Sequence, residues 1–179
     1  MNIEVDLDRI KLLGEKRSDD NFRFRSYLKN LDIEIGELDK LVHTINEKVT
    51  SQIDCTKCAN CCNTISPLLT IEDINKFAKG LNIATTELTT TYCIKSENEI
   101  DKFIFNKVPC PFLKDNKCTN YEFRLKDCED YPHLHKEGFM FRLWGVIDNY
   151  SICPIVFNVF ERLKEELWNR NWRHSLEDI

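Results

Sequence analysis

The feature that most constrains this chain is a group of four cysteines within eight residues. The segment reads Cys55-Thr-Lys-Cys58-Ala-Asn-Cys61-Cys62. Two thiols separated by two residues in a turn can converge on one metal ion, which is why Cys-x-x-Cys is typical of half a zinc site. The repeated spacing is also that of the cysteine loop in bacterial iron–sulfur ferredoxins. The segment therefore predicts a metal site built from thiolates.

The adjacent pair, Cys61 and Cys62, limits the geometry of that site. Side chains of neighbouring residues point to opposite faces of an extended chain and lie about 100° apart on a helix. The two thiols are therefore poorly placed to bind one zinc ion together. A polynuclear cluster, or two neighbouring sites, accommodates them better, so the pair favours iron–sulfur chemistry.

The total number of cysteines indicates metal ligands rather than disulfides. The chain has 9 cysteines in 179 residues, about 5 %, whereas disulfide scaffolds have roughly 8–10 %. The first residues carry acids and no apolar stretch that would indicate a signal peptide. No run approaches the ~18 apolar residues of a membrane span. We therefore expect a cytoplasmic protein, with no membrane partner, whose thiols stay reduced.

Four further cysteines are spread over the second half of the chain, at Cys110, Cys118, Cys128 and Cys153. With the first group they make eight candidate metal ligands. Cys110 and Cys153 each precede a proline, as the last cysteine of the ferredoxin loop does. The ninth cysteine, Cys93, belongs to no motif, and we expect it to be a small buried apolar side chain.

Two alternatives stay open at this point. Cys153 is either a ligand or simply a buried residue at the start of a helix. His133 and His135 lie on one side of an extended chain, where they are either further ligands or ordinary hydrogen-bonding side chains.

Three motifs, in order, resemble the YkgJ-type cysteine-cluster family. The family pattern is Cys-x-x-Cys-x-x-Cys-Cys, then Pro-Cys-Pro-Phe-Leu, then Cys-x-x-Tyr-Glu-x-Arg-Pro-x-x-Cys-Arg. In this chain the three motifs stand at 55–62, 109–113 and 118–129. The resemblance implies a zinc- or iron-chelating domain. Because the family includes flagellin lysine N-methylases, the resemblance also allows protein-lysine methylation.

The third motif departs from the family pattern at two positions. Leu125 stands where the family has proline, and Glu129 stands where it has arginine. All of the family's cysteines are present. Within the same motif, Tyr121 and Arg124 lie near Cys118. They either hydrogen-bond a metal-bound sulfur or an anion, or form a packed aromatic and an ordinary surface ion pair.

Net charge and the motifs that are missing narrow the function further. The chain has 25 Lys and Arg against 30 Asp and Glu, a net charge of −5. No nucleic-acid partner is expected, because nonspecific affinity for nucleic acids comes mostly from neutralising phosphates. The sequence has no Gly-x-Gly-x-x-Gly, Walker or Gly-x-Ser-x-Gly motif. Whether the protein is an enzyme stays open. If it is one, the metal site carries the chemistry, and the partner or substrate is an unidentified protein.

The apolar pattern predicts an α-rich α+β fold, a single small domain with a minor β element organised around the cysteine site. Apolar residues at spacings of three and four predict a helix over 34–53. Thr70 opens a second helix with a capping signal, and Gly80 is expected to end it. Pro154 stands at a permitted first-turn position of a C-terminal helix over 154–172.

Short strands are expected at 102–105, 111–113 and 139–147, and the stretch 55–69 is expected to be a loop. We therefore expect one cysteine-cluster domain over 1–179. It comprises a helical N-terminal part, 1–53, a metal-binding core, 54–155, and the C-terminal helix.

Three functions fit these observations. The first is a protein that binds iron, preferably as an iron–sulfur cluster, and has a redox or protein-modifying role such as lysine methylation. The second is a non-catalytic zinc module that binds another protein, which is less favoured because a second regular Cys-x-x-Cys is missing. The third is a thiol redox switch, which no βαβ context supports.

Overall fold

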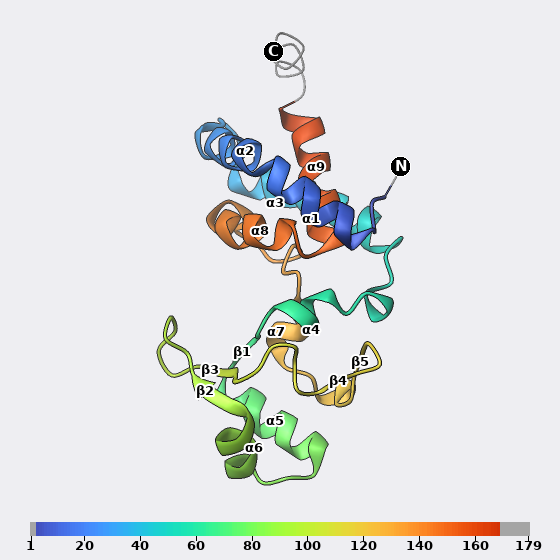
Figure 1. Ribbon diagram of the computed structural model, residues 1–179. Helices are drawn as coiled ribbons and strands as arrows, with labels where there is room; N and C mark the ends of the chain where they lie inside the picture. The colour runs from blue at the N-terminus through green and yellow to red at the C-terminus, as the bar shows by residue number, and fades with distance from the viewer. Residues whose placement is uncertain (1–2, 169–179) are drawn as a thin grey trace. The chain divides into compact units, whose positions relative to one another are not determined.

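The computed structural model describes residues 3–168, and the chain divides into two compact units. The first unit is formed by the residues up to Asp54 and those from Pro132 onward, and we call it the helical unit. The second, Cys55–Tyr131, is the cysteine unit. Helices dominate and the strands are short (Figure 1), so the predicted α-rich α+β class is confirmed. The predicted domain boundaries stay predictions.

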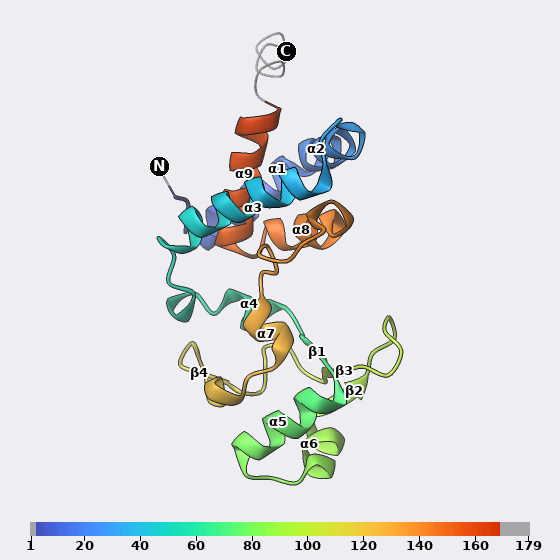
Figure 2. The same ribbon diagram turned by 180° about the vertical axis from the view of Figure 1, so that it is seen from behind.

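Five α-helices build the described part of the helical unit: α1 (Leu7–Lys16), α2 (Ser18–Asn30), α3 (Ile35–Thr50), α8 (Leu143–Tyr150) and α9 (Pro154–Leu167). A short 3₁₀ turn over Phe139–Phe141 precedes α8. The Asp6 side chain begins α1 by accepting a hydrogen bond from the N–H of Arg9 at 3.0 Å. Figure 2 shows α9 in red beside α1, α3 and α8, with which it packs.

Helix α9 forms the centre of this unit because its first two turns are apolar except for Asn158, whose side chain hydrogen-bonds to the backbone of Glu4 and Pro154. All residues from Pro154 to Phe160 are buried, and a helix that is apolar all round is typical of a core position. The expected start of a helix at Pro154 is confirmed. The remainder of the expected helix, up to residue 172, extends beyond the described residues.

The expected strand over 139–147 is wrong. The segment forms the 3₁₀ turn and α8 instead. Leu143, Val146 and Tyr150 recur at spacings of three and four and are all buried. This helical period outweighs the aromatic and β-branched composition that suggested a strand. The helix predicted over 34–53 is confirmed as α3.

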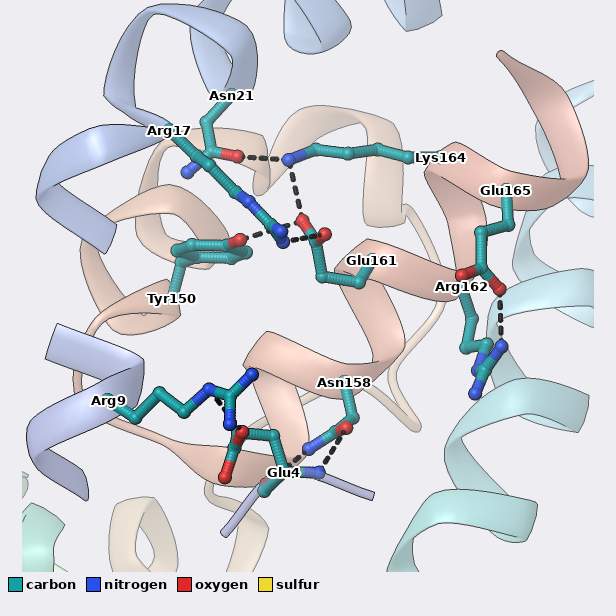
Figure 3. Close-up of polar contacts among 10 residues, drawn as sticks. All are labelled: Glu4, Arg9, Arg17, Asn21, Tyr150, Asn158, Glu161, Arg162, Lys164 and Glu165. Atoms are coloured by element: carbon teal, nitrogen blue, oxygen red, sulfur yellow. Dashed lines mark hydrogen bonds and ion pairs between the residues drawn. The ribbon is translucent and has the colours of Figure 1, made fainter. Parts of the chain in front are cut away.

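A partly buried polar network joins α2, α8, α9 and Arg17, the residue between α1 and α2 (Figure 3). The Glu161 carboxylate accepts hydrogen bonds from Tyr150 Oη and Lys164 Nζ, both at 2.7 Å, and from Arg17. Lys164 also donates to Asn21 Oδ1. Burial lowers the pKa of Lys164 and raises the pKa of Tyr150. The network therefore places three donors around one carboxylate in the helical core.

Among residues 3–168, no single helix has the length and apolarity to cross a membrane. Helices α8 and α9 meet that criterion only as a pair, bent by 116°.

Four α-helices and two small sheets build the cysteine unit. The helices are α4 (Asn60–Thr64), α5 (Ile71–Leu81), α6 (Thr85–Tyr92) and α7 (Lys126–Asp130). The first sheet has the antiparallel order β1-β3-β2, formed by β1 (Leu68–Leu69), β3 (Phe103–Phe105) and β2 (Cys93–Lys95). The second is a hairpin of β4 (Leu113–Lys114) and β5 (Lys117–Cys118).

The core of the cysteine unit lies between the first sheet and α5. The rings of Phe77, Phe105 and Phe112 pack with centroids 4.8 to 5.7 Å apart, at edge-to-face or tilted angles that aromatic rings prefer. Cys93 is buried in this core, as expected. The strand expected at 102–105 is confirmed as β3. The expected loop over 55–69 is wrong in part, because the segment includes α4 and β1.

Helix α5 begins at the predicted capping residue but does not stop at Gly80. Thr70 and Asp73 form a reciprocal capping box. The helix continues to Leu81 and ends at Asn82, which takes the left-handed conformation with φ 55°. The absence of a side chain at Gly80 has another role, since a Cβ there would lie 2.6 Å from Phe123 Cβ.

Candidate metal centre

The first cysteine motif turns twice within eight residues. Cys55–Lys57 form a 3₁₀ turn, closed by a hydrogen bond of 3.2 Å from the Cys58 N–H to the Cys55 carbonyl. Ala59 then takes the left-handed conformation, with φ 50°, and α4 begins at the next residue. This sharp change of direction places Cys61 and Cys62 together on a short helix, where both are half-buried.

The hairpin β4–β5 and the residues just before it carry Cys110 and Cys118, the next two candidate ligands along the chain. The backbone N–H of Cys110 donates to the carbonyl of Cys62 at 2.8 Å, which ties the start of the hairpin to α4. Leu113 pairs with Cys118 across the hairpin. The N–H of Thr119 donates to the Phe112 carbonyl at 2.9 Å. Cys118 therefore lies on β5, and Cys110 lies just before β4 of the same hairpin.

Two carboxylates anchor α7, the helix that bears Cys128. Asp73, at the start of α5, accepts a hydrogen bond from the N–H of Lys126 at 2.8 Å. Asp127 accepts one from the N–H of Leu68 at 3.0 Å. These contacts fix the first turn of α7 to α5 and β1. Sequence reasoning did not identify these two residues as anchors, because no local motif marks them.

Electrostatic effects connect four of the candidate thiols. Burial is the main cause that raises the pKa of Cys128 to about 12, and the charges of Cys62, Asp127, Cys110 and Cys118 contribute to the same shift. Burial likewise raises the pKa of Cys110 to about 11, with contributions from Cys62 and Cys118. Burial and the charge of Cys62 raise the pKa of Cys118. Thiols from three separate segments therefore lie within electrostatic range of one another.

Cys62 is the most acidic of the four. A side-chain hydrogen bond with Cys61 lowers its pKa to about 7, so a substantial fraction is thiolate at neutral pH. Cys128 is exposed as a residue, yet burial dominates the pKa of its thiol.

Backbone N–H groups support two of these sulfurs. Hydrogen bonds from the N–H groups of Phe112 and Leu113 lower the pKa of Cys110, against the larger effect of burial. A hydrogen bond from the N–H of Asn120 acts in the same way on Cys118. Such donors stabilise the thiolate form, which is the form that binds metal ions.

Arg124 and Tyr121 form a stacked pair beside Cys118. The guanidinium carbon of Arg124 lies 4.1 Å from the centre of the Tyr121 ring, and Nη1 donates to the Tyr121 carbonyl at 3.2 Å. The positive charge also lowers the pKa of Cys118. The pair is thus a cation–π contact at the edge of the thiol group, rather than the surface ion pair considered from the sequence.

The other candidate ligands lie elsewhere in the chain. Cys55 is exposed and Cys58 half-buried in the turn before α4. Cys153 is buried at the start of α9 in the helical unit. His133 takes the left-handed conformation with φ 62°, and its carbonyl accepts from Arg142 Nη1 at 2.7 Å. Whether these residues and His135 are ligands stays a prediction. Among residues 3–168, no three His, Cys, Asp or Glu side chains stand in a ready arrangement for a metal ion.

The chemistry of these thiol donors nevertheless suits a soft metal ion. Four thiols, two of them supported by N–H donors and one already acidic, are typical of a zinc site or an iron–sulfur site. The site therefore defines the chain as a cysteine-rich protein of the metal-binding class.

The chain belongs to the CxxCxxCC family, whose model bears the description "Putative zinc- or iron-chelating domain" and matches residues 54–153. This range contains all eight candidate ligands. The resemblance noted in the sequence is therefore confirmed, and the family description supports metal binding. No curated protein and no solved structure matches the chain.

Proposed function

We propose that the cysteine unit holds iron, preferably as an iron–sulfur cluster, through Cys62, Cys110, Cys118 and Cys128. The observation that carries this proposal is the electrostatic coupling of these four thiols. Their mutual repulsion and their burial make the thiolate forms costly without a cation. A bound metal ion would relieve that repulsion.

Two features favour iron–sulfur chemistry over a single zinc ion. The Cys61–Cys62 contact adds a fifth thiol beside the four, one more than the four ligands of a structural zinc site. Cys110 packs against the apolar core of the cysteine unit, and a hydrophobic shell of this kind limits solvent access and sets redox potential. Cys55 and Cys58, in the turn before α4, belong to the same proposed set, and Cys153 stays a separately proposed ligand.

The proposed activity is redox or protein-modifying, with lysine methylation as the modification that the family resemblance allows. A bound cluster would supply electron transfer. The chain itself contributes the N–H donors to Cys110 and Cys118 and the charge of Arg124. Both lower the proton affinity of the sulfurs, against the larger effect of burial, and would stabilise the thiolate form once a metal ion displaces the proton. The proposal places the protein in the reducing cytoplasm, with a protein as partner or substrate.

A non-catalytic zinc module is the second candidate. Four thiols are enough for one all-cysteine zinc site, and its binding free energy would add to folding stability. In that case the protein would act by binding another protein.

Elemental analysis and visible absorption of one anaerobically purified sample test the proposal. We expect iron with sulfide and a broad charge-transfer band. Colourless protein with one or two zinc ions would support the module instead, and protein with metal far below one equivalent would refute both.

Cysteine variants test the assignment of ligands in the same assay. Cys110→Ala and Cys128→Ala should each lose most of the bound metal. Cys93→Ala is the matched control, because Cys93 is buried in the same unit but belongs to no motif. Full metal content in both ligand variants would show that the coupled thiols are not the site.

A further inference from the structure

Three aromatic side chains of the helical unit face solvent, on α2, on α8 and on the 3₁₀ turn before α8. Phe22, Phe141 and Trp144 are 40 %, 71 % and 55 % exposed. The ring centres of Phe22 and Trp144 are 5.6 Å apart. Phe22 lies on α2 and Trp144 on α8, two helices that contact each other and lie side by side in Figures 1 and 2. Clustered exposed aromatics are typical of interaction sites.

Two cations of α2 lie over these rings. The guanidinium carbon of Arg25 is 4.2 Å from the centre of the Trp144 ring, and Lys29 Nζ is 5.3 Å from that of Phe141. Within residues 3–168, neither cation is within ion-pair distance of a carboxylate, and Arg25 Nε is buried with no hydrogen-bond acceptor. We call these five residues, Phe22, Arg25, Lys29, Phe141 and Trp144, the aromatic surface.

The charge of the aromatic surface is unusual for this chain. Asp and Glu outnumber Lys and Arg by 30 to 25, yet these two cations face no carboxylate in the described residues. A carboxylate from another molecule would supply the missing partner. Apolar residues beside that carboxylate could pack on the rings. Gly145, next to Trp144 in the sequence, leaves open space, because an added Cβ there meets nothing within 4 Å.

We propose that the aromatic surface binds an acidic peptide segment of a partner protein, one that alternates carboxylates with apolar side chains. Tryptophan and arginine are the residues that most often dominate the energy of protein interfaces. A cation stacked on an exposed ring presents positive charge and apolar surface side by side. A segment that alternates carboxylates with apolar side chains is complementary to both the charge and the apolar surface. The proposal is independent of the metal at the cysteine unit.

An anionic membrane is the less favoured occupant. Stable electrostatic attachment to anionic lipid takes a cluster of several Lys and Arg residues, whereas this surface has two. A second copy of the chain is the remaining alternative, and both are distinguished by the experiment below.

The experiment measures binding of a labelled synthetic peptide of alternating Glu and Leu to the full chain, beside a counterpart with Lys in place of Glu. We expect the Glu peptide to bind, with an affinity that falls as salt rises, and the Lys peptide not to bind. Phe141→Ala combined with Trp144→Ala should weaken binding at least about tenfold. Arg25→Glu combined with Lys29→Glu should reverse the preference between the two peptides.

Matched controls separate the surface from general effects of substitution. Ile100→Ala removes another exposed apolar side chain, 91 % exposed, from the cysteine unit. Lys48→Glu reverses an exposed charge on α3. Both should bind the Glu peptide like the unaltered protein. Equal binding of the two peptides, or unchanged binding in the aromatic variant, would overturn the proposal. So would self-association or binding to anionic vesicles that depends on Trp144 while the peptide does not bind.

Discussion

Replacing Glu161 by Gln should destabilise the helical unit by about 3 kcal/mol. The glutamine side chain has nearly the same shape as that of glutamate, but it keeps only one oxygen and carries no charge. In the structure the carboxylate accepts from Tyr150 and Lys164, both at 2.7 Å, and from Arg17 (Figure 3). The variant therefore leaves three donors, two of them cationic, facing a single neutral acceptor.

The magnitude follows from the number of bonds lost and from burial. A hydrogen bond to a charged group contributes about 1.5–3 kcal/mol, and the remaining oxygen can accept one or two of the three. Removing one partner of a fully buried ion pair costs about 3–5 kcal/mol. The Glu161 side chain is 23 % exposed and that of Lys164 is 10 % exposed, which places the expected cost at the lower end of this range.

Tryptophan fluorescence during urea and thermal unfolding reports the unfolding of the helical unit and therefore measures this cost. The two tryptophans among the described residues, Trp144 and Trp168, belong to the helical unit. For a chain of this size, 3 kcal/mol corresponds to a fall of about 6–12 °C in the unfolding midpoint.

Glu165→Gln is the matched control for Glu161→Gln. It makes the same change on the same helix, at a carboxylate that pairs with Arg162 and is 45 % exposed. An exposed pair of this kind contributes less than about 1 kcal/mol. If Glu161→Gln proved no more destabilising than Glu165→Gln, the network would not be the source of stability that its geometry indicates.

Three further predictions follow from other parts of the structure. Because the pKa of Tyr150 is raised in the folded state, the unfolded chain ionises first. Stability should therefore fall above pH ~10 by up to about 1.4 kcal/mol per pH unit, and urea titrations of Tyr150→Phe should show a flatter fall. Gly80→Ala should destabilise the cysteine unit by about 1–3 kcal/mol in circular dichroism melts, because its Cβ would meet Phe123. Gly36→Ala, which meets nothing within 4 Å on α3, should not destabilise. Removal of the metal with a chelator should lower the melting temperature, since the free energy of metal binding contributes to folding and is lost. An unchanged melt would count against a metal that takes part in folding.

The sequence predicted the candidate thiols but not their grouping. The Cys-x-x-Cys spacing and the later cysteines identify donors, because thiolates at such spacing are typical of metal sites. Which of them meet depends on contacts between distant segments. The hydrogen bond from Lys126 to Asp73 spans 53 residues and the one from Leu68 to Asp127 spans 59. No periodicity or local motif encodes such pairs.

The helices also differ in how well the sequence predicts them. Predictions were confirmed where a local signal is strong, as in the periodicity of α3 and the Thr70 capping box of α5. The prediction for α8 was wrong because its eight residues include Trp, Val, Ile and Tyr, which favour strands. Only its burial against α9 makes the helical period decisive, and that contact is tertiary.

The two departures from the family pattern fall on residues that build the turn before Cys128, and the structure accounts for both. Leu125 takes φ −61° and ψ 151°, after Arg124 at ψ 155°. These are the values that a proline and the residue before it adopt. Here the side chain of Leu125, fully buried in the core of the cysteine unit, holds the same turn by packing. Glu129, in place of arginine, forms an ion pair with Lys76 of α5 at 2.7 Å. In this chain the packing of Leu125 and the Lys76–Glu129 ion pair therefore stabilise the backbone that presents Cys128, where the family pattern has proline and arginine.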